Sequence, residues 1–88
     1  MRNSGESISV TVRFLGPAAD VVGHHEAVYE LRAPATLGTL SELIFAQYAR
    51  LAGPPGGVRF AINQEYAEAP QPLRSGDEVA VIPPVSGG

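Results

Sequence analysis

Residues 76–88 read GDEVAVIPPVSGG, and this stretch contains both a strong strand signal and an unusual chain end. Its part Glu78–Ile82 is nearly all apolar, which is typical of a strand near the middle of a sheet. Pro83 and Pro84 then remove two backbone donors, so the sheet is expected to stop there. Residues 85–88 carry little side-chain bulk and end in two glycines. The stretch therefore predicts a central strand followed by a thin, projecting tail.

Three other segments alternate between apolar and polar residues, the period expected of half-buried strands. They are Ser7–Leu15 (SISVTVRFL), Glu26–Arg32 (EAVYELR) and Val58–Asn63 (VRFAIN). The first two are joined by residues 16–25, expected as a loop, and neighbouring strands of this kind predict a hairpin. Residues 63–65 are a turn candidate, because Asn tolerates the left-handed region.

One segment, Thr36–Leu51, changes to a helical period. Its apolar residues recur at i, i+3 and i+4 and form one stripe, namely Leu40, Leu43, Ile44, Tyr48 and Leu51. Two threonines compete as N-cap: Thr36, and Thr39 as the first residue of the capping box TLSE. The sequence GPPGG at 53–57 is expected to stop the helix.

The predicted order β-β-α-β-β fits one small domain of 88 residues. A single helix with one apolar stripe covers one face of a sheet, which gives an α+β two-layer sandwich. This arrangement resembles the ubiquitin-like β-grasp, a mixed sheet of four to five strands covered on one face by one main helix. The first and last strands would then lie side by side at its centre. Residues 1–6 are expected to be flexible, residues 71–77 to form a loop, and residues 83–88 to project as the tail.

The uncovered face of the sheet is the second feature of interest. If Val79 and Val81 point toward the helix, Ile82 points away from it. Leu15 and Tyr66 are expected to join Ile82 there. Such an apolar group is either a partner surface or a set of scattered surface hydrophobes.

Composition and motifs argue against several functions. The net charge of −3 without a basic cluster argues against nucleic-acid binding. No apolar run approaches the ~20 residues that span a bilayer, and residues 1–7 lack a signal-peptide core. These observations predict a cytoplasmic protein that binds neither nucleic acid nor membrane.

Internal chemistry is also poorly supported. Without cysteine, the chain has no thiolate nucleophile and no thiolate metal ligand. His24 and His25 lack partner ligands and are expected as surface turn residues. Asp77 and Glu78 are adjacent in sequence, so their side chains should diverge rather than form an acid–base pair. The GPPGG sequence lacks the Lys, Ser or Thr of a phosphate loop. We therefore expect this chain to bind no metal and no cofactor.

The tail remains as the reactive candidate. Gly87 and Gly88 have no Cβ, so an extended segment can enter a channel too narrow for other residues. The Gly88 α-carboxylate can be activated as an acyl-adenylate and then attacked by a nucleophile. All six basic side chains are arginines. This absence of lysine reflects either compositional bias or an advantage to an activated carboxyl carrier that lacks side-chain amines.

The segments INQEYA (62–67) and LRSGDEVAVIPPVSGG (73–88) resemble the small subunit of molybdopterin synthase, the MoaD-type sulfur carrier. The resemblance implies that an adenylating enzyme of the MoeB type, related to ubiquitin-activating enzymes, activates Gly88 with ATP and Mg²⁺. Sulfur delivery then gives a C-terminal thiocarboxylate. The tail enters the large, MoaE-type subunit and donates sulfur to cyclic pyranopterin monophosphate, forming molybdopterin. Two small subunits are expected at the ends of a large-subunit dimer.

The resemblance also implies positions for partner contact. Leu15, Tyr66 and Ile82 correspond to the hydrophobic docking patch of the family, and the tail residues Pro83, Pro84, Val85 and Ser86 lead into the partner. The chain departs from the family at two places. Ile82 stands where an aromatic residue is familiar, and GPAADVVG replaces a segment that often holds Arg.

Two other functions stay open. The same fold and tail could serve another sulfur pathway: thiamine, cysteine synthesis, or tRNA thiolation with protein tagging. The Pro-Pro-Val-Ser sequence before the glycines favours the pterin role, because thiamine carriers lack that proline pair. Fold and carboxylate alone do not define the recipient. Alternatively, the chain is a non-catalytic binding module whose carboxylate is captured by a partner.

Overall fold

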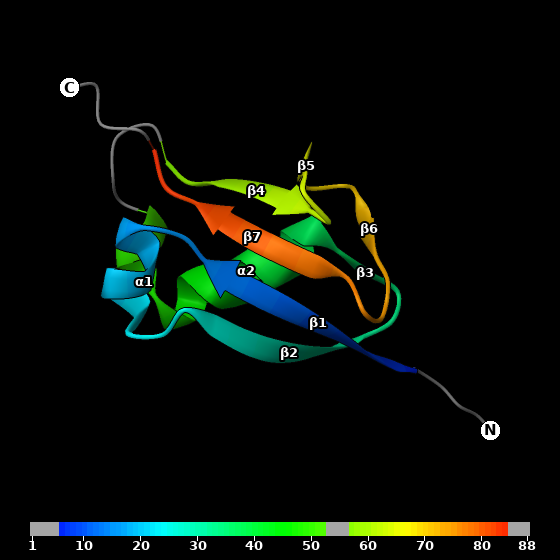
Figure 1. The fold of residues 1–88 in the computed structure, drawn as a ribbon. Coiled ribbons are helices and arrows are strands. Elements are labelled where there is room, and N and C mark those ends of the chain that lie inside the picture. The colour runs from blue at the N-terminus through cyan, green and yellow to red at the C-terminus, as the bar shows by residue number, and fades with distance from the viewer. Residues whose placement is uncertain (1–5, 53–56, 85–88) are drawn as a thin grey trace.

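The computed structural model describes residues 6–52 and 57–84 (Figure 1). Expectations for residues 1–5, for the helix stop at 53–56 and for the tail residues Val85, Ser86, Gly87 and Gly88 therefore fall outside the described part. Glu6 was expected to be flexible with the residues before it. Its carbonyl accepts a hydrogen bond of 2.7 Å from the Ala33 N–H, so it is tied to the sheet.

The architecture is the predicted α+β sandwich with a mixed five-stranded sheet. The strands lie in the order β2-β1-β7-β4-β5, with bounds β1 Ser7–Phe14, β2 Glu26–Arg32, β4 Arg59–Ile62, β5 Glu65–Ala67 and β7 Glu78–Ile82. Strands β1 and β7 are parallel to each other, and every other pair in this sheet is antiparallel. Two short strands that sequence reasoning missed, β3 (Ala35–Thr36) and β6 (Pro72–Leu73), form a separate small ladder.

The first and last strands lie together at the centre of the sheet, as predicted. Their register pairs Val12 with Val79 and Phe14 with Val81. Val12, Val79 and Val81 are each 0% exposed. The alternation of β1 and β7 therefore places one face of each strand entirely within the core, where burial of apolar area supplies most of the stability.

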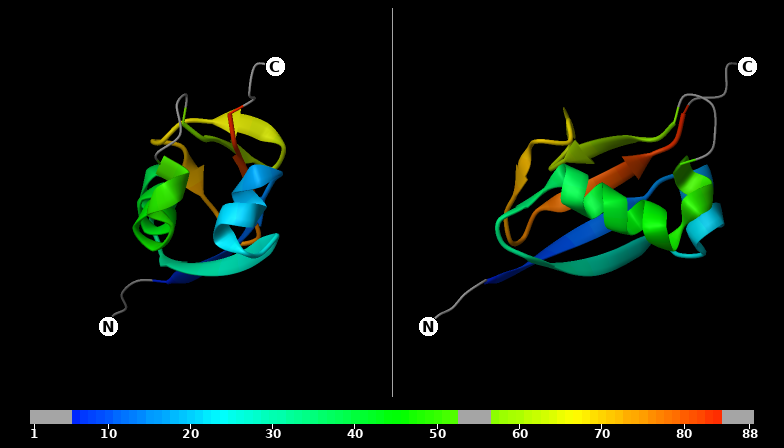
Figure 2. Two further views of the ribbon diagram at one scale, coloured as in Figure 1. Left: turned by 90° about the vertical axis from the view of Figure 1, so that its left-hand side faces the viewer. Right: turned by 180° about the vertical axis from the view of Figure 1, so that it is seen from behind.

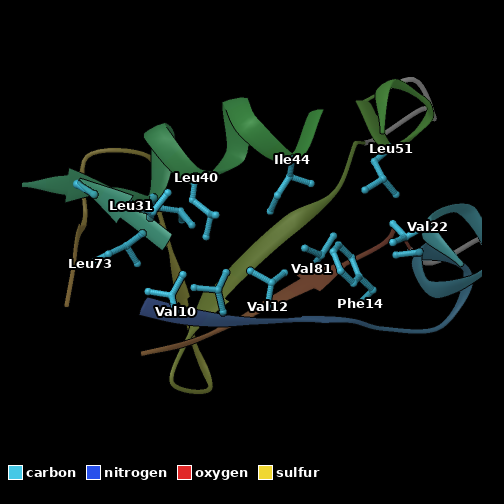
Figure 3. Close-up of a cluster of buried hydrophobic side chains, with 14 of the residues drawn as sticks. Val10, Val12, Phe14, Val22, Leu31, Leu40, Ile44, Leu51, Leu73 and Val81 are labelled. Atoms are coloured by element: carbon cyan, nitrogen blue, oxygen red, sulfur yellow. The ribbon is translucent and has the colours of Figure 1, made fainter. Parts of the chain in front are cut away.

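The main helix α2 (Leu37–Gln47) crosses that buried face of the sheet (Figure 2). Leu40 and Ile44 point from the helix toward Val10, Val12 and Val81 (Figure 3). The predicted stripe is wrong at one position, because Leu43 is 43% exposed while Leu37 is buried. The helix therefore covers the sheet with a narrower strip than the i, i+3, i+4 count suggested.

The N-terminal end of α2 confirms one of the two predicted caps, while the helix ends before the predicted segment does at Leu51. Thr36 is the N-cap, since its side chain accepts the hydrogen bond from Thr39 N at 3.2 Å. The helix ends at Gln47, because Tyr48 has φ −133° and ψ 73°, outside the helical region. A 3₁₀ turn, η1 (Ala49–Ala52), follows and buries Leu51.

Residues 16–25 are not a simple loop, because they contain the short helix α1 (Pro17–Val22). Pro17 is well placed at the first turn of a helix, and Gly23 ends it in the left-handed region with φ 88°. Six residues give too little periodicity for a confident helix prediction. Tertiary packing stabilises this short helix, because Ala18, Ala19 and Val22 are buried in the core.

A tyrosine connects the edge strand to the end of the main helix. The Tyr29 hydroxyl on β2 donates a hydrogen bond to the side-chain oxygen of Gln47 on α2. Burial raises the pKa of the Tyr29 phenol, and nearby Tyr48 raises it further. Among the elements described here, no helix combines the length and apolar character needed to cross a membrane.

The cap assignment can be tested with two single variants. Thr36→Ala removes the only side chain that caps the Thr39 N–H, and we expect it to lower the free energy of unfolding by about 1 kcal/mol. Thr39→Ala keeps that cap and should cost clearly less. Urea unfolding followed by circular dichroism measures both. A larger loss for Thr39→Ala would show that Thr39 is the effective cap.

Candidate functional site

The candidate site begins where β7 leaves the sheet. Leu15 N donates to the Val81 carbonyl at 3.1 Å. Beyond Ile82, Pro83 and Pro84 are half-buried and lie outside any strand, as predicted. A methyl group placed on Gly16 would lie 3.9 Å from Cγ of Pro83, so the root of the tail is next to the turn that follows β1.

A groove of about 380 Å³ lies beside this root, lined by α1, η1, Val58 and the two prolines. Its lining is mainly apolar, and Arg50 is the one charged residue among its lining residues. The structure thus leaves an apolar surface at the base of the tail. This surface is separate from the outer face of the sheet, because it is formed by the helical elements.

The three predicted docking residues all lie on the outer face of the sheet, away from α2. Leu15 follows Phe14, which pairs with Val81, so Leu15 and Ile82 are neighbours. Tyr66 on β5 is 65% exposed and pairs with Ala61 of β4. Ile82 pairs with Arg59, which lies between Ile82 and Tyr66. The apolar group is therefore interrupted by a cation.

Arg59 is the surface residue that sequence reasoning missed. Its guanidinium carbon lies 4.6 Å from the centroid of the Tyr66 ring, a cation–π contact. The alternation of β4 carried the signal, because inward Phe60 and Ile62 imply outward Arg59 and Ala61. Its position beside Tyr66 required the β4–β5 hairpin, which was predicted only as a turn.

A second arginine on the same face is neutralised within the chain. Arg13 lies 3.1 Å from Glu78 and 3.9 Å from Glu26, and both ion pairs found among the described residues involve it. These groups are about half exposed, so solvent screening leaves the pairs a small contribution to stability. Their effect is to pair the Arg13 cation within the chain, with one guanidinium shared between two carboxylates.

Asn63 and Asp77, which lie near the start of β7, have a structural role that the sequence did not reveal. Asn63, in the left-handed region with φ 50°, donates through Nδ2 to Asp77 at 3.0 Å. Its Oδ1 accepts from Glu78 N at 3.0 Å. Asp77 also accepts from Arg74 N at 2.8 Å. These bonds clamp the β4–β5 turn to the start of β7 and so set where the final strand begins.

The contacts of Asp77 and Glu78 also bear on whether the chain could hold an acid–base pair or a metal site. The Asp77 carboxylate faces Asn63 while the Glu78 carboxylate faces Arg13, so the two side chains diverge as predicted. His24 and His25 are exposed. Within residues 6–52 and 57–84, no three His, Asp or Glu side chains are grouped as a metal site would require.

Comparison with known proteins places the chain in a family. The ThiS family model matches residues 12–88, and the chain belongs to this family. A molybdopterin synthase sulfur carrier subunit of Chlamydomonas reinhardtii is 35% identical over 83 residues, which cover 92% of this chain and 100% of the relative. A Caenorhabditis briggsae protein described in the same words is 36% identical and is covered over 99% of its length.

Solved structures show the same fold. SAMP1 from Haloferax volcanii has a TM-score of 0.78 at 25% identity, covering 91% of this chain and 99% of that one. The complex of subunits 1 and 2 of molybdopterin-converting factor from Helicobacter pylori contains a chain that matches with a TM-score of 0.61 at 28% identity. That match covers 92% of this chain and 100% of that one. The predicted ubiquitin-like β-grasp and the resemblance to MoaD-type carriers are confirmed.

The role of Asn63 can be separated into hydrogen bonding and backbone conformation. Asn63→Ala loses both side-chain bonds and puts at φ 50° a residue that tolerates the left-handed region less well than asparagine, so we expect a loss of about 2–4 kcal/mol in unfolding free energy. Asn63→Gly loses the same bonds without the conformational cost and should lose about half as much. Urea denaturation measures both. Equal losses would show that the positive φ of Asn63 carries no energetic cost.

Proposed function

We propose that this chain is the sulfur-carrier small subunit of a molybdopterin synthase, with the Gly88 carboxylate as its reactive group. One observation carries the proposal. The central strand β7 leads directly from Ile82 on the outer face into the proline root of the tail. Docking of that face and delivery of the chain end are therefore mechanically coupled. The full-length similarity to sulfur carrier subunits supports the same role.

The chemistry assigned to Gly88 has three steps. Its carboxylate oxygen attacks the α-phosphate of ATP on an adenylating enzyme, and pyrophosphate leaves. Sulfide (HS⁻) from the sulfur donor then attacks the acyl carbon, AMP leaves, and a thiocarboxylate remains. Inside the large subunit, the thiocarboxylate gives its sulfur to cyclic pyranopterin monophosphate, and water restores the carboxylate. ATP, Mg²⁺ and the substrate pocket belong to the partners, while this chain supplies the acyl group and the docking surface.

The partner surface is assigned to the outer face. Leu15, Ile82 and Tyr66 contact the large subunit, and Pro83, Pro84, Val85 and Ser86 lead Gly87 and Gly88 into its active site. The Helicobacter pylori relative was solved as a complex of two subunits, which supports a large-subunit partner for this chain. We assign a heterotetramer, with one carrier at each end of a large-subunit dimer.

A second candidate function has its own support. The likeness to Haloferax volcanii SAMP1, which is named small archaeal modifier protein 1, fits a carrier that acts in another sulfur pathway or in protein tagging. This second function would use the same Gly88 carboxylate and the same activation by adenylation. The two functions differ only in the nucleophile or acceptor that meets the activated chain end.

Intact-mass spectrometry tests the reactive group. Chain produced with its native adenylating enzyme, ATP and a sulfur donor should gain the mass of one sulfur replacing one oxygen at Gly88. A variant with one alanine added after Gly88 is the control and should stay unmodified, because the two glycines no longer form the chain end. Carrier function is excluded if sulfur never appears on the wild-type chain.

Reconstitution identifies the pathway. Purified thiocarboxylate chain mixed with the large synthase subunit and pyranopterin should form molybdopterin in vitro. Expression of the chain should restore molybdopterin formation in a strain that lacks its own small subunit. Restoration of thiamine synthesis, or covalent transfer of the chain to other proteins, would instead support the second candidate.

The docking surface is tested by a charge placed in it. Ile82→Asp should weaken binding to the large subunit at least about tenfold, because a carboxylate would be buried in an apolar contact. Val28→Asp is the matched control: Val28 is 64% exposed on β2 and lies at a distance from the patch. Calorimetric titration measures binding, and circular dichroism checks folding. Equal effects of the two variants would place the interface elsewhere.

A further inference from the structure

Arg59 and Tyr66 form a preassembled pair on the outer face. Arg59 begins β4, and Tyr66 lies in β5 opposite Ala61, so the arginine and the ring are diagonal neighbours on adjacent antiparallel strands. Diagonal positions lie within reach of long and aromatic side chains. The guanidinium carbon is 4.6 Å from the ring centroid. Beneath the pair, Ala61 is only 6% exposed although it faces away from the helix.

Arg59 differs from Arg13 in that it forms no ion pair with another described residue of the chain. Both ion pairs among the described residues belong to Arg13. Glu68 lines the same small hollow as Arg59 and Tyr66, yet it forms no ion pair with Arg59. The cation–π contact is an electrostatic attraction to the ring, so it positions the guanidinium beside Tyr66 while N–H donors of the fork stay available to a partner.

The neighbours of this cation are apolar. Arg59 pairs directly with Ile82, and Leu15 lies on the other side of Ile82. A planar guanidinium that is already held in place binds a carboxylate through two parallel hydrogen bonds at a reduced entropic cost. Arginine and tyrosine are also the residue types that most often dominate interface energetics.

We propose that Arg59, held by Tyr66, binds a carboxylate of the large subunit that docks on this face. The inference rests on the proposed function and adds the chemistry of the contact: an acidic side chain next to an apolar surface that covers Ile82. An apolar contact through Leu15 and Ile82 alone is non-directional and does not define the orientation of the carrier on its partner. The ion pair at one side of them fixes that rotation, and with it the direction in which Pro83 and Pro84 send the tail.

The test compares three variants of the full chain in calorimetric titrations with the large synthase subunit of the source organism. Arg59→Met keeps most of the side-chain length and removes the charge. It should weaken binding at least about tenfold at low salt. Arg59→Lys keeps the charge without the planar fork and should fall in between. Arg32→Met, at the far end of the same face, makes the same change in net charge and should stay within about twofold of wild type.

Salt dependence and coupling make the assignment specific. The difference between wild type and Arg59→Met should shrink as salt is raised, because the contact is ionic. Tyr66→Ala should also weaken binding. The fold-loss in affinity of the Arg59→Met, Tyr66→Ala double variant should be smaller than the product of the two single fold-losses, because the two residues act as one unit. Circular dichroism of each variant shows whether the fold is intact.

The outcomes separate this inference from the function on which it rests. If wild type binds and Arg59→Met binds as Arg32→Met does, the ion pair is disproved while the carrier function stands. If Arg59→Met slows only thiocarboxylate formation and leaves large-subunit binding unchanged, the assignment to the large subunit is also disproved. If wild type does not bind the large subunit at all, both the proposed function and this contact fail.

Discussion

The parallel pairing of β1 with β7 is the contact on which the other features of this molecule depend. It joins residues from opposite ends of the chain, such as Val12 and Val79, across the centre of the sheet. Bringing such distant segments together costs loop-closure entropy, which is recovered only when the intervening elements also pack. Helix α2 does this by placing Leu40 and Ile44 over the paired strands. The same pairing brings Leu15 next to Ile82, so one contact organises both the core and the candidate site.

The start of β7 is set by polar contacts rather than by the core. Asn63 and Asp77 connect the β4–β5 turn to the first residues of the strand through hydrogen bonds of 3.0 Å. A shift of one residue would exchange the buried and outward faces of β7. The clamp therefore protects two things at once: the burial of Val79 and Val81, and the outward position of Ile82 beside the root of the tail.

The outer face divides into two electrostatic halves. On one half, Arg13 is paired within the chain with Glu26 and Glu78, so its cation is not free to bind a partner. On the other half, the Arg59 side chain rests on Tyr66 next to Ile82. The proposed sulfur-carrier role requires docking that is accurate enough to deliver a carboxylate and that is also reversible. A small apolar patch with a single oriented cation suits both needs, because ionic contacts add specificity without a large buried area.

The sequence by itself determined the four longer strands of the sheet and the single covering helix, because period and turn chemistry are local properties. The reactive chain end at Gly88 stays a prediction, since it lies outside the described residues. The sequence left the buried face of β7 conditional, because Glu78–Ile82 is nearly all apolar. The structure decides it by burying Val79 and Val81 against the helix. Tertiary structure decided what depends on distant partners. The helix α1 forms because its small apolar residues pack into the core, and the Leu43 side chain faces solvent because the sheet occupies a narrower strip of α2.

The position of Arg59 between Ile82 and Tyr66 exists only in the folded sheet. It requires both the β4–β7 and the β4–β5 registers, and a register is a relation between strands that no single segment encodes.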